Sequence, residues 1–194
     1  MTEQRSGRPR ASSRETLAEA ACELFLEQGY DGTSIADIAN RAGVSRSSFF
    51  NYFESKADIL WAGLDERIAA LDARLADDQT TDAATAVLAG LTVLGDGFAP
   101  DSLALAIVNA DAMGLETELE REAGVRRTRI GAVVAARLHR SGIDVIPSRV
   151  AGAAFAGAVL AAIEAWAHEG AGRAPLARVL AEGLAAASPT LPAP

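Results

Sequence analysis

Apolar residues recur at helical spacing along nearly the whole chain, and no segment shows the strict alternation of a half-buried strand. Residues 13–28 show the pattern most clearly. One face of this segment carries apolar side chains at the i, i+3, i+4, i+7 and i+8 positions of a helix: Leu17, Ala20, Ala21, Leu24 and Phe25. Gly29 comes next, and a glycine in the left-handed conformation commonly ends a helix. The first helix is therefore expected over residues 13–28.

Two short helices around a glycine turn are expected next. Ser34 can accept a hydrogen bond from the free amides of the first, and Asp37 lies three residues later, at the spacing of a capping box. Gly43 supplies a tight turn, and Ser45 is placed to cap a third helix that reaches Tyr52. This arrangement is typical of a helix-turn-helix, whose second helix enters the major groove of DNA while the first braces it against the backbone.

Longer helices fill the rest of the chain. Ser55 and Asp58 form a second capping-box pair at the start of a long amphipathic helix that links this head to the rear body of the protein. Asp82 and Asp101 are further N-cap candidates, and Pro175 suits the first position of the last helix. After the long helix, the expected helices cover residues 82–95, 101–114, 116–141, 148–169 and 175–187.

The pattern predicts an all-α protein of about nine helices with a helix-turn-helix head and a helical body. We expect four regions: a flexible basic arm at residues 1–12, a DNA-binding head at 13–56, a helical body at 57–188 and a flexible tail at 189–194. The chain has 194 residues, of which 49% are hydrophobic and 23% charged, and this composition is typical of a folded globular protein.

Charge is distributed unevenly between these regions. The net charge is -8, which by itself disfavours nucleic-acid binding, because Lys and Arg dominate affinity for phosphates. Residues 1–56, however, hold seven Lys and Arg against eight Asp and Glu, whereas residues 57–194 hold eleven against eighteen. Four Arg against one Glu make the first 14 residues basic, so this arm is expected either to contact DNA or to form a solvated tail. The acidic excess lies in the body, and the head stays compatible with DNA.

The sequence offers little support for an enzyme, a metalloprotein or a membrane protein. No apolar run approaches the ~20 residues of a membrane span and no secretory signal is evident, so a cytoplasmic protein is expected. Cys22 is the single cysteine, and His139 and His168 lie in separate helices without metal-ligand spacing. We therefore expect no catalytic residue, no cofactor and no metal site. An adaptor that kept the head without binding DNA is the remaining alternative, and the polar outer face of the third helix argues against it.

That outer face holds the candidates for DNA recognition. The residues expected to read base edges are Arg46, Ser47, Ser48 and Asn51. An Arg can donate two hydrogen bonds to guanine, and an Asn can pair with adenine. The residues expected to hold phosphates stand at helix ends around this face: Thr33, Ser45, Tyr52 and Lys56, the last being the only lysine in the chain. Ordinary capping and solvated surface are the alternative, and for Ser45 capping alone would suffice.

Residues 23–60, ELFLEQGYDGTSIADIANRAGVSRSSFFNYFESKADIL, resemble the N-terminal signature of the TetR family of regulators. The match to the family signature includes the turn glycine, the inward-facing hydrophobic residues, the aromatic cluster and the closing lysine, all at the same spacing. The resemblance implies an all-helical homodimer, a repressor of a palindromic operator, in which a small effector bound to the rear domain spreads the two heads and releases the DNA. Phe50 departs from the family, which commonly has Tyr there, so a phosphate-binding hydroxyl is missing and Asn51 and Tyr52 must carry more of the positioning.

The dimer implied by the resemblance pairs through the last two long helices as a four-helix bundle. An apolar stripe in residues 148–169 supplies the expected interface residues: Phe155, Val159, Ile163 and Trp166. Gly152, Ala156 and Gly157 would let another helix approach closely. The same stripe would also satisfy an intrachain core, and we favour a mixture of the two roles.

The family's effector pockets lie among the middle helices, which here supply mostly apolar side chains. The expected lining residues are Leu91, Leu94, Phe98, Leu105, Val108, Met113, Val133, Val134 and Leu138. They favour a small apolar effector, with plain core packing as the alternative for each.

The rear domain resembles, more faintly, the mycofactocin-associated branch of the family, through FESKADILWAG and AAIEAW. This second resemblance implies a long-chain acyl-CoA effector. Arg126, Arg127 and Arg129 could then meet the phosphates of CoA. The alternative is that they pair on a solvated helix face with nearby acids such as Glu118, Glu120 and Glu122.

Overall fold

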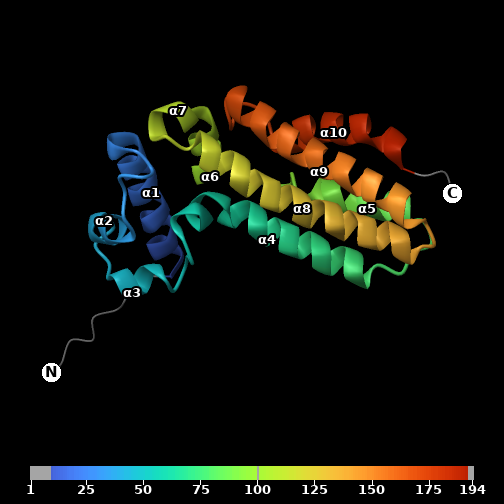
Figure 1. Ribbon diagram of the computed structural model, residues 1–194, viewed down its shortest axis with the longest axis horizontal. Coiled ribbons are helices and arrows are strands. Elements are labelled where there is room, and N and C mark those ends of the chain that lie inside the picture. Colours follow the sequence, from blue (N-terminus) through green and yellow to red (C-terminus); the bar gives the residue numbers. More distant parts are fainter. Residues whose placement is uncertain (1–9, 100, 192–194) are drawn as a thin grey trace.

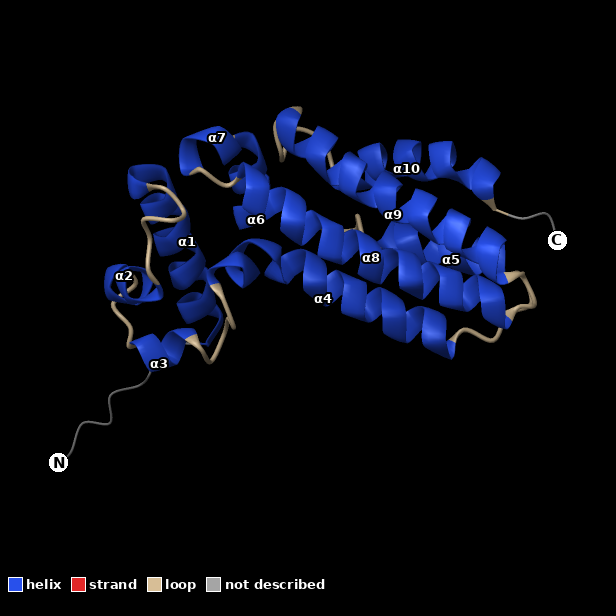
Figure 2. Cartoon of the chain, viewed as in Figure 1, coloured by secondary structure: helices blue, strands red, loops and turns tan. Residues whose placement is uncertain are grey.

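The structure is a computed structural model that describes residues 10–99 and 101–191, and over these residues the protein is all-helical (Figures 1 and 2). The predicted architecture, a three-helix head followed by a helical body, is confirmed. In chain order the helices are α1 (Arg10–Gln28), α2 (Ile35–Arg41), α3 (Arg46–Phe49), α4 (Lys56–Asp77), α5 (Ala83–Val93), α6 (Ser102–Val108), α7 (Ala110–Met113), α8 (Glu116–Arg140), α9 (Val145–His168), α10 (Leu176–Ala187) and the short 3-10 helix η1 (Ser188–Thr190).

Figure 1 shows the head, α1 to α3, at one end of an elongated molecule. The long helix α4 leaves the head and runs beside α8, and α9 packs along α8 and against α10. Helices α6 and α7 sit where the head meets the body and contact α1. The head is therefore held by the body from two sides, through α4 and through the α6–α7 segment.

Side-chain caps fix the helix starts, as expected from the sequence. Ser34 and Ser55 each accept a hydrogen bond in a complete capping box, and Ser45 accepts from the amide of Ser48. Asp82 and Asp101 cap α5 and α6 in the same way. The turn glycines take the left-handed conformation, with φ of +79° at Gly29 and +69° at Gly43. These caps and turns depend only on residues close together in the chain, which is why they could be predicted from the sequence.

Several boundaries differ from the expected ones. The helix expected at 101–114 is broken into α6 and α7 at Asn109, whose side-chain amide donates to the carbonyl of Leu105 at 2.8 Å. Helix α9 begins at Val145, so Pro147 lies within its first turn, where a missing N–H costs nothing. Pro175 is the N-cap of α10 rather than its first residue. Helix α1 begins at Arg10; most of the expected arm and part of the expected tail lie outside the described residues.

Helix α9 corrects the expectation that no apolar run approaches the length of a membrane span. Among the described residues it is the one helix long and apolar enough to pass that test, with a mean hydropathy of 1.7 over an 18-residue window. Half of this window is buried inside the protein. Packing between α8 and α10 explains the apolar composition, since a helix covered on two sides needs apolar side chains on both.

The stripe expected at the dimer interface faces the interior of the protomer. Phe155, Val159, Ile163 and Trp166 are at most 3% exposed, and Trp166 donates its indole N–H to the carbonyl of Ala174 at 2.8 Å. In the protomer these four side chains therefore form part of the intrachain core, the alternative role given for the stripe. Of the glycines, Gly152 serves an intrachain contact: a Cβ there would lie 2.3 Å from the carbonyl oxygen of Gly131 on α8.

Candidate nucleic-acid interface and effector cavity

The outer edge of α3 is held out to solvent by a packed head. Arg46, Ser47 and Asn51 are exposed and Ser48 is half-buried; we call these four residues the α3 edge. Helix α3 itself ends at Phe49, yet the amides of residues 52 and 53 still bond to the Phe49 carbonyl at 2.9 and 3.1 Å. The backbone therefore keeps turning beyond the helix, and Asn51 stays beside the α3 residues as the sequence predicted.

Aromatic residues anchor this edge from behind. Phe49 is fully buried; its ring packs edge-on against Phe50, with centroids 5.4 Å apart, and in a tilted arrangement against Phe53, with centroids 5.7 Å apart. Phe50 is 49% exposed, and the guanidinium of Arg46 lies 5.9 Å from its ring centroid. The Phe50 ring thus supports Arg46 from the side, a role that needs no hydroxyl.

Hydroxyl groups gather at the start of α3. The Ser45 hydroxyl lies 2.8 Å from the hydroxyls of both Ser47 and Ser48, and it also accepts from the Ser48 amide at 3.1 Å. Tyr52 is half-buried against the core of the head. Ser45 therefore caps the helix, as the alternative interpretation required, while remaining exposed at its end.

Two of the residues expected to hold phosphates are engaged inside the head. Thr33 is 1% exposed, and its hydroxyl donates to the carbonyl of Gly29 at 2.8 Å, so its side chain has no free surface. Lys56 is half-buried and donates to the carbonyls of Tyr30 and Thr33 at 2.6 and 2.8 Å. Its ammonium also lies 4.1 Å from the centre of the Tyr30 ring. Lys56 therefore fastens the start of α4 to the α1–α2 loop, and one ammonium proton remains for another acceptor.

Tyr30 joins the head to the body by two hydrogen bonds. Its amide donates to the carbonyl of Met113 at the end of α7 at 2.7 Å, and its hydroxyl donates to Glu118 on α8 at 3.1 Å. Burial, reinforced by the negative charge of Glu118, raises the pKa of Tyr30, so the hydroxyl keeps its proton near neutral pH. This contact had no signal in the sequence, because it depends on how α7 and α8 pack beside the head.

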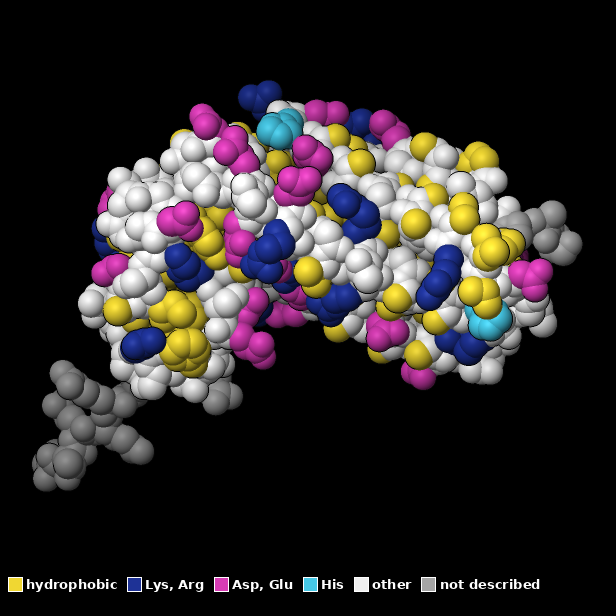
Figure 3. All heavy atoms as spheres, in the orientation of Figure 1, with side chains coloured by type: hydrophobic (Ala, Val, Ile, Leu, Met, Phe, Trp, Pro, Cys, Tyr) yellow, Lys and Arg dark blue, Asp and Glu magenta, His cyan; other side chains and the backbone are white. Residues whose placement is uncertain are grey.

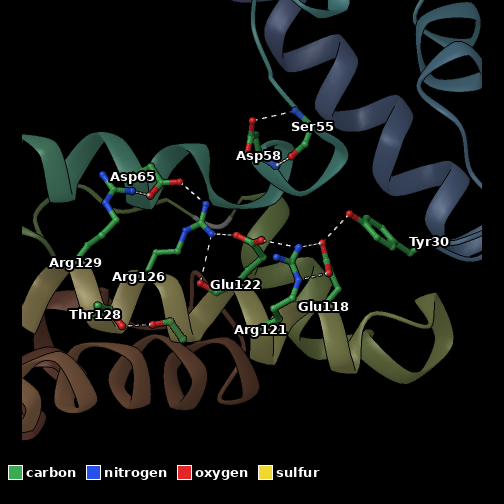
Figure 4. A network of polar contacts seen from close by, with 11 residues as sticks. Tyr30, Ser55, Asp58, Asp65, Glu118, Arg121, Glu122, Arg126, Thr128 and Arg129 are labelled. Atoms are coloured by element: carbon green, nitrogen blue, oxygen red, sulfur yellow. Dashed lines mark hydrogen bonds and ion pairs between the residues drawn. The ribbon is translucent and has the colours of Figure 1, made fainter.

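A chain of ion pairs continues from Tyr30 along α8 (Figure 4). Arg121 pairs with Glu118 and with Glu122, and its hydrogen bond to Glu118 lowers the pKa of that carboxyl. Arg126 is 4% exposed; it pairs with Glu122 and donates to Asp65 of α4 at 2.6 Å. We call this set, Tyr30, Asp65, Glu118, Arg121, Glu122, Arg126 and Arg129, the α8 network, since Arg129 also pairs with Asp65. Both arginines therefore pair with acids, but not on the solvated face that the alternative interpretation assumed: Arg126 is buried, and the partner of Arg129 lies on α4.

A cavity of about 510 Å³ lies among α4, α6, α7, α8 and α9. Its walls are largely apolar: Trp61, Ile107, Val108, Ala110, Leu119, Ala123, Leu160 and Ile163. Its ionisable lining residues are Asp111, Glu116, Glu120, Glu164, Arg127 and His168. Trp61 belongs to the cavity and also touches the α8 network, since the guanidinium of Arg126 lies 4.9 Å from its ring centroid.

The residues expected to line an effector pocket are spread over several environments. Val108 lines the cavity, and Val133 is half-buried beside the core. Leu105 is exposed on α6. The others are buried in the body core: Leu91, Leu94, Phe98, Met113, Val134 and Leu138. Periodicity marked the apolar positions correctly but could not separate a cavity wall from the surrounding core.

A second hollow is a shallow groove between α9 and α10. Small side chains line most of it: Ala154, Gly157, Ala158, Ala161, Ala165, Gly183 and Ala186. A Cβ at Gly157 would meet nothing within 4 Å, unlike one at Gly152. Further along α9, Ile146 and Val150 are 75% and 54% exposed, and Figure 3 shows hydrophobic side chains gathered over that end of the body. The face of α9 that carries these residues is apolar and uncovered.

Two family models match the chain. The model described as bacterial regulatory proteins of the tetR family matches residues 17–62, and the MftR C-terminal domain model matches residues 100–192. The protein named mycofactocin biosynthesis transcriptional regulator MftR from Mycobacterium tuberculosis is 36% identical over 73 residues, which are 38% of this chain and 37% of MftR. The repressor DhaR from Mycobacterium sp. is 45% identical over 47 residues, 24% of each chain. The matched segments thus span well under half the length of these relatives.

Solved structures share the fold. NalD of Pseudomonas aeruginosa, the secondary repressor of the MexAB-OprM efflux pump, is 18% identical with a TM-score of 0.53, over 93% of this chain and 96% of NalD. The TetR family regulator CifR, a cysteine mutant bound to a 26-bp operator duplex, is 24% identical with a TM-score of 0.53, over 96% of this chain and 100% of CifR. At these identities the likeness establishes the all-helical architecture with its helix-turn-helix head.

Proposed function

We propose that this protein, a member of the TetR family of bacterial regulators with an MftR-type C-terminal domain, is a cytoplasmic repressor that binds a palindromic operator as a homodimer. It is a DNA-binding regulator and not an enzyme. The exposed α3 edge is the observation that carries the proposal, because nothing in the packing of the head requires an Arg and an Asn on that face. A small effector in the cavity releases the operator.

The structure supports distinct roles for the residues around α3. Arg46 and Asn51 are free to reach base edges in the major groove, where they suit guanine and adenine. Ser45 and Tyr52 stand beside them within reach of phosphates, and Lys56 can offer its remaining proton. Thr33 supports the α1–α2 loop from inside instead of meeting the phosphate backbone.

The test is selection of bound duplexes from a random pool, followed by gel shifts on the selected palindrome. Arg46→Ala should cost about 1–3 kcal/mol on the preferred sequence and flatten the base preference at one position of each half-site. Lys56→Ala should lower affinity evenly across sequences. Arg74→Ala, an exposed arginine of α4, is the matched control and should bind like the parent protein. Equal losses from Arg46→Ala and Arg74→Ala would contradict the role of the α3 edge.

The dimer is proposed to form through the uncovered face of α9 and the groove beside α10. Small residues allow two helices to approach closely, and Ile146 and Val150 would lose their exposed apolar surface. Ala161→Arg would place a charge in this contact and should weaken the dimer by at least about tenfold in sedimentation equilibrium. Ala69→Arg, on the exposed face of α4, adds the same side chain elsewhere and should leave the dimer intact. A monomeric parent protein at micromolar concentration would overturn the proposal.

The cavity is the proposed effector site because its position links it to the head. Ala110 and Asp111 line it from α7, whose last residue, Met113, accepts the hydrogen bond from Tyr30. Apolar walls favour an effector with an apolar body. Of the three arginines suggested for CoA phosphates, Arg126 and Arg129 are engaged by Asp65, and Arg127 alone lines the cavity. This placement weakens the support for a long-chain acyl-CoA.

A further inference from the structure

Phe50 is a large apolar side chain beside the α3 edge, on the surface that meets DNA in the proposed complex. It is 49% exposed, whereas its neighbour Phe49 is fully buried. In the described part of the head, the other large hydrophobic residue left exposed is Leu26, which belongs to α1. A single exposed hydrophobic side chain is common on protein surfaces, so the contacts of Phe50 decide whether it has a role there.

Two contacts hold the Phe50 ring in a defined position. The buried Phe49 ring packs edge-on against it, with an interplanar angle of 81°. The guanidinium of Arg46 lies 5.9 Å from its centroid. Phe50 keeps right-handed helical backbone angles although α3 ends at Phe49, so Arg46 and Phe50, four positions apart, share one face. A ring that is already ordered loses little conformational freedom on binding, which favours its use in recognition.

The serines of the α3 edge are partly engaged by their own helix. The hydroxyls of Ser47 and Ser48 both lie 2.8 Å from the hydroxyl of Ser45. Like the other polar groups of this edge, they suit hydrogen bonds to base edges or phosphates. One feature of the major groove needs a different partner: the 5-methyl group of thymine, which is recognised by apolar contact. Among the exposed residues of the segment 45–51, Phe50 is the side chain that can supply such a contact.

We propose that Phe50 is a specificity-determining residue, whose ring contacts the 5-methyl group of a thymine near the guanine read by Arg46. This proposal rests on the operator binding proposed above and adds a thymine to each half-site. The 5.9 Å between the Arg46 guanidinium and the Phe50 ring lies between one and two base-pair steps of about 3.4 Å. The thymine is therefore expected within two base pairs of that guanine. Contact removes apolar surface of both the ring and the methyl group from water, which is favourable.

The test uses the full-length protein and the palindrome selected from random duplexes. Each thymine within two base pairs of the guanine for which Arg46→Ala loses its preference is replaced, in one half-site, by deoxyuridine. This base lacks the 5-methyl group and keeps the same hydrogen-bonding edge. In gel shifts, one of these replacements should weaken binding of the parent protein by about two- to fivefold. At the same position, a 5-methylcytosine–guanine pair should be bound about two- to fivefold tighter than a cytosine–guanine pair, because it restores the methyl group.

Variants of Phe50 separate contact with the methyl group from support of Arg46. Phe50→Ala should bind the thymine and deoxyuridine duplexes equally, while Phe50→Leu, which stays apolar, should keep part of the difference. Leu26→Ala removes a side chain of comparable exposure, 45%, from α1 and should keep the full difference. Each comparison uses one protein on two duplexes, so a loss of folded protein in any variant cancels.

Two results would overturn the proposal while operator binding stands: a parent protein that binds the two duplexes equally, or a Phe50→Ala variant that still distinguishes them. A selected palindrome with no thymine within two base pairs of that guanine would do the same. In each case Phe50 would only support Arg46. Failure to select any duplex would instead overturn the repressor proposal and this one with it, so the two failures can be told apart.

Discussion

The contact between the Tyr30 hydroxyl and Glu118 can be removed without disturbing the packing around it. Tyr30→Phe keeps the ring, which packs on Phe25 with centroids 5.0 Å apart and lies beneath the Lys56 ammonium. Glu118 keeps its ion pair with Arg121, so no buried carboxylate is left without a partner. The variant therefore isolates one hydrogen bond between the head and the body.

The expected loss depends on the geometry of this bond. Hydrogen bonds to charged groups are worth about 1.5–3 kcal/mol at best, and short charge-assisted ones lie near ~2.6 Å between oxygens. The distance here is 3.1 Å and the Glu118 side chain is 21% exposed, both of which weaken the bond. We expect Tyr30→Phe to lower the free energy of unfolding by about 1 kcal/mol, measured by urea denaturation.

Tyr52→Phe is the matched control, because it removes the chain's other tyrosine hydroxyl from a half-buried position in the same head. It should leave stability within about 0.5 kcal/mol of the parent. A double-mutant cycle with Glu118→Ala, which removes the acceptor, should return a coupling of about 1 kcal/mol for Tyr30. Operator release by effector should weaken in Tyr30→Phe. A coupling of zero, or an unaltered response to effector, would refute the argument that this bond links the head to the body.

Two further predictions concern the body. Gly152→Ala should lower the stability of the protein by about 1–3 kcal/mol in thermal unfolding, because the added Cβ would clash with the backbone of α8. The added Cβ of Gly157→Ala would lie in open space, so this variant should be as stable as the parent or slightly more stable. Equal effects of the two substitutions would contradict the close crossing of α8 and α9. The Arg137 guanidinium donates to Asp78 and lowers the pKa of that carboxyl, so this pair contributes stability above the usual Asp range that is lost as pH falls through the lowered pKa. The difference in melting temperature between the parent and Asp78→Asn should accordingly be greatest above about pH 4 and shrink below it; a difference that grows in acid would contradict this sign.

Local signals in the sequence predicted the head well. The capping boxes at Ser34 and Ser55 and the glycine turn at Gly43 depend on residues within a few positions of one another, so they are independent of how the body packs. The exposed edge with Arg46 and Asn51 was predictable from the same periodicity, since aromatic residues occupy the inward positions of that segment.

Features that depend on contacts between distant helices were not predictable in this way. Helix α9 carries apolar side chains on more than one face, and periodicity cannot tell that the stripe with Phe155 faces the interior while Ile146 stays exposed. Thr33 and Lys56 are polar groups at helix ends, but backbone carbonyls of the folded loop already engage them. Trp61 falls within a predicted amphipathic helix, and only the packing of α8 beside α4 places it at a cavity next to Arg126.

Arg126 explains how a ligand in the cavity could act on the head without touching it. Its guanidinium lies over the ring of Trp61, which lines the cavity, and forms an ion pair with Glu122. Glu122 and Glu118 both pair with Arg121, and Glu118 accepts the hydrogen bond from Tyr30 of the head. A buried cation of this kind is held by several partners at once, so a shift of the Trp61 ring has to be absorbed by the ion pairs around it. The same helix that carries Trp61 begins at Lys56, which fastens the α1–α2 loop, so displacement of α4 and rearrangement of the α8 network would reach the head together.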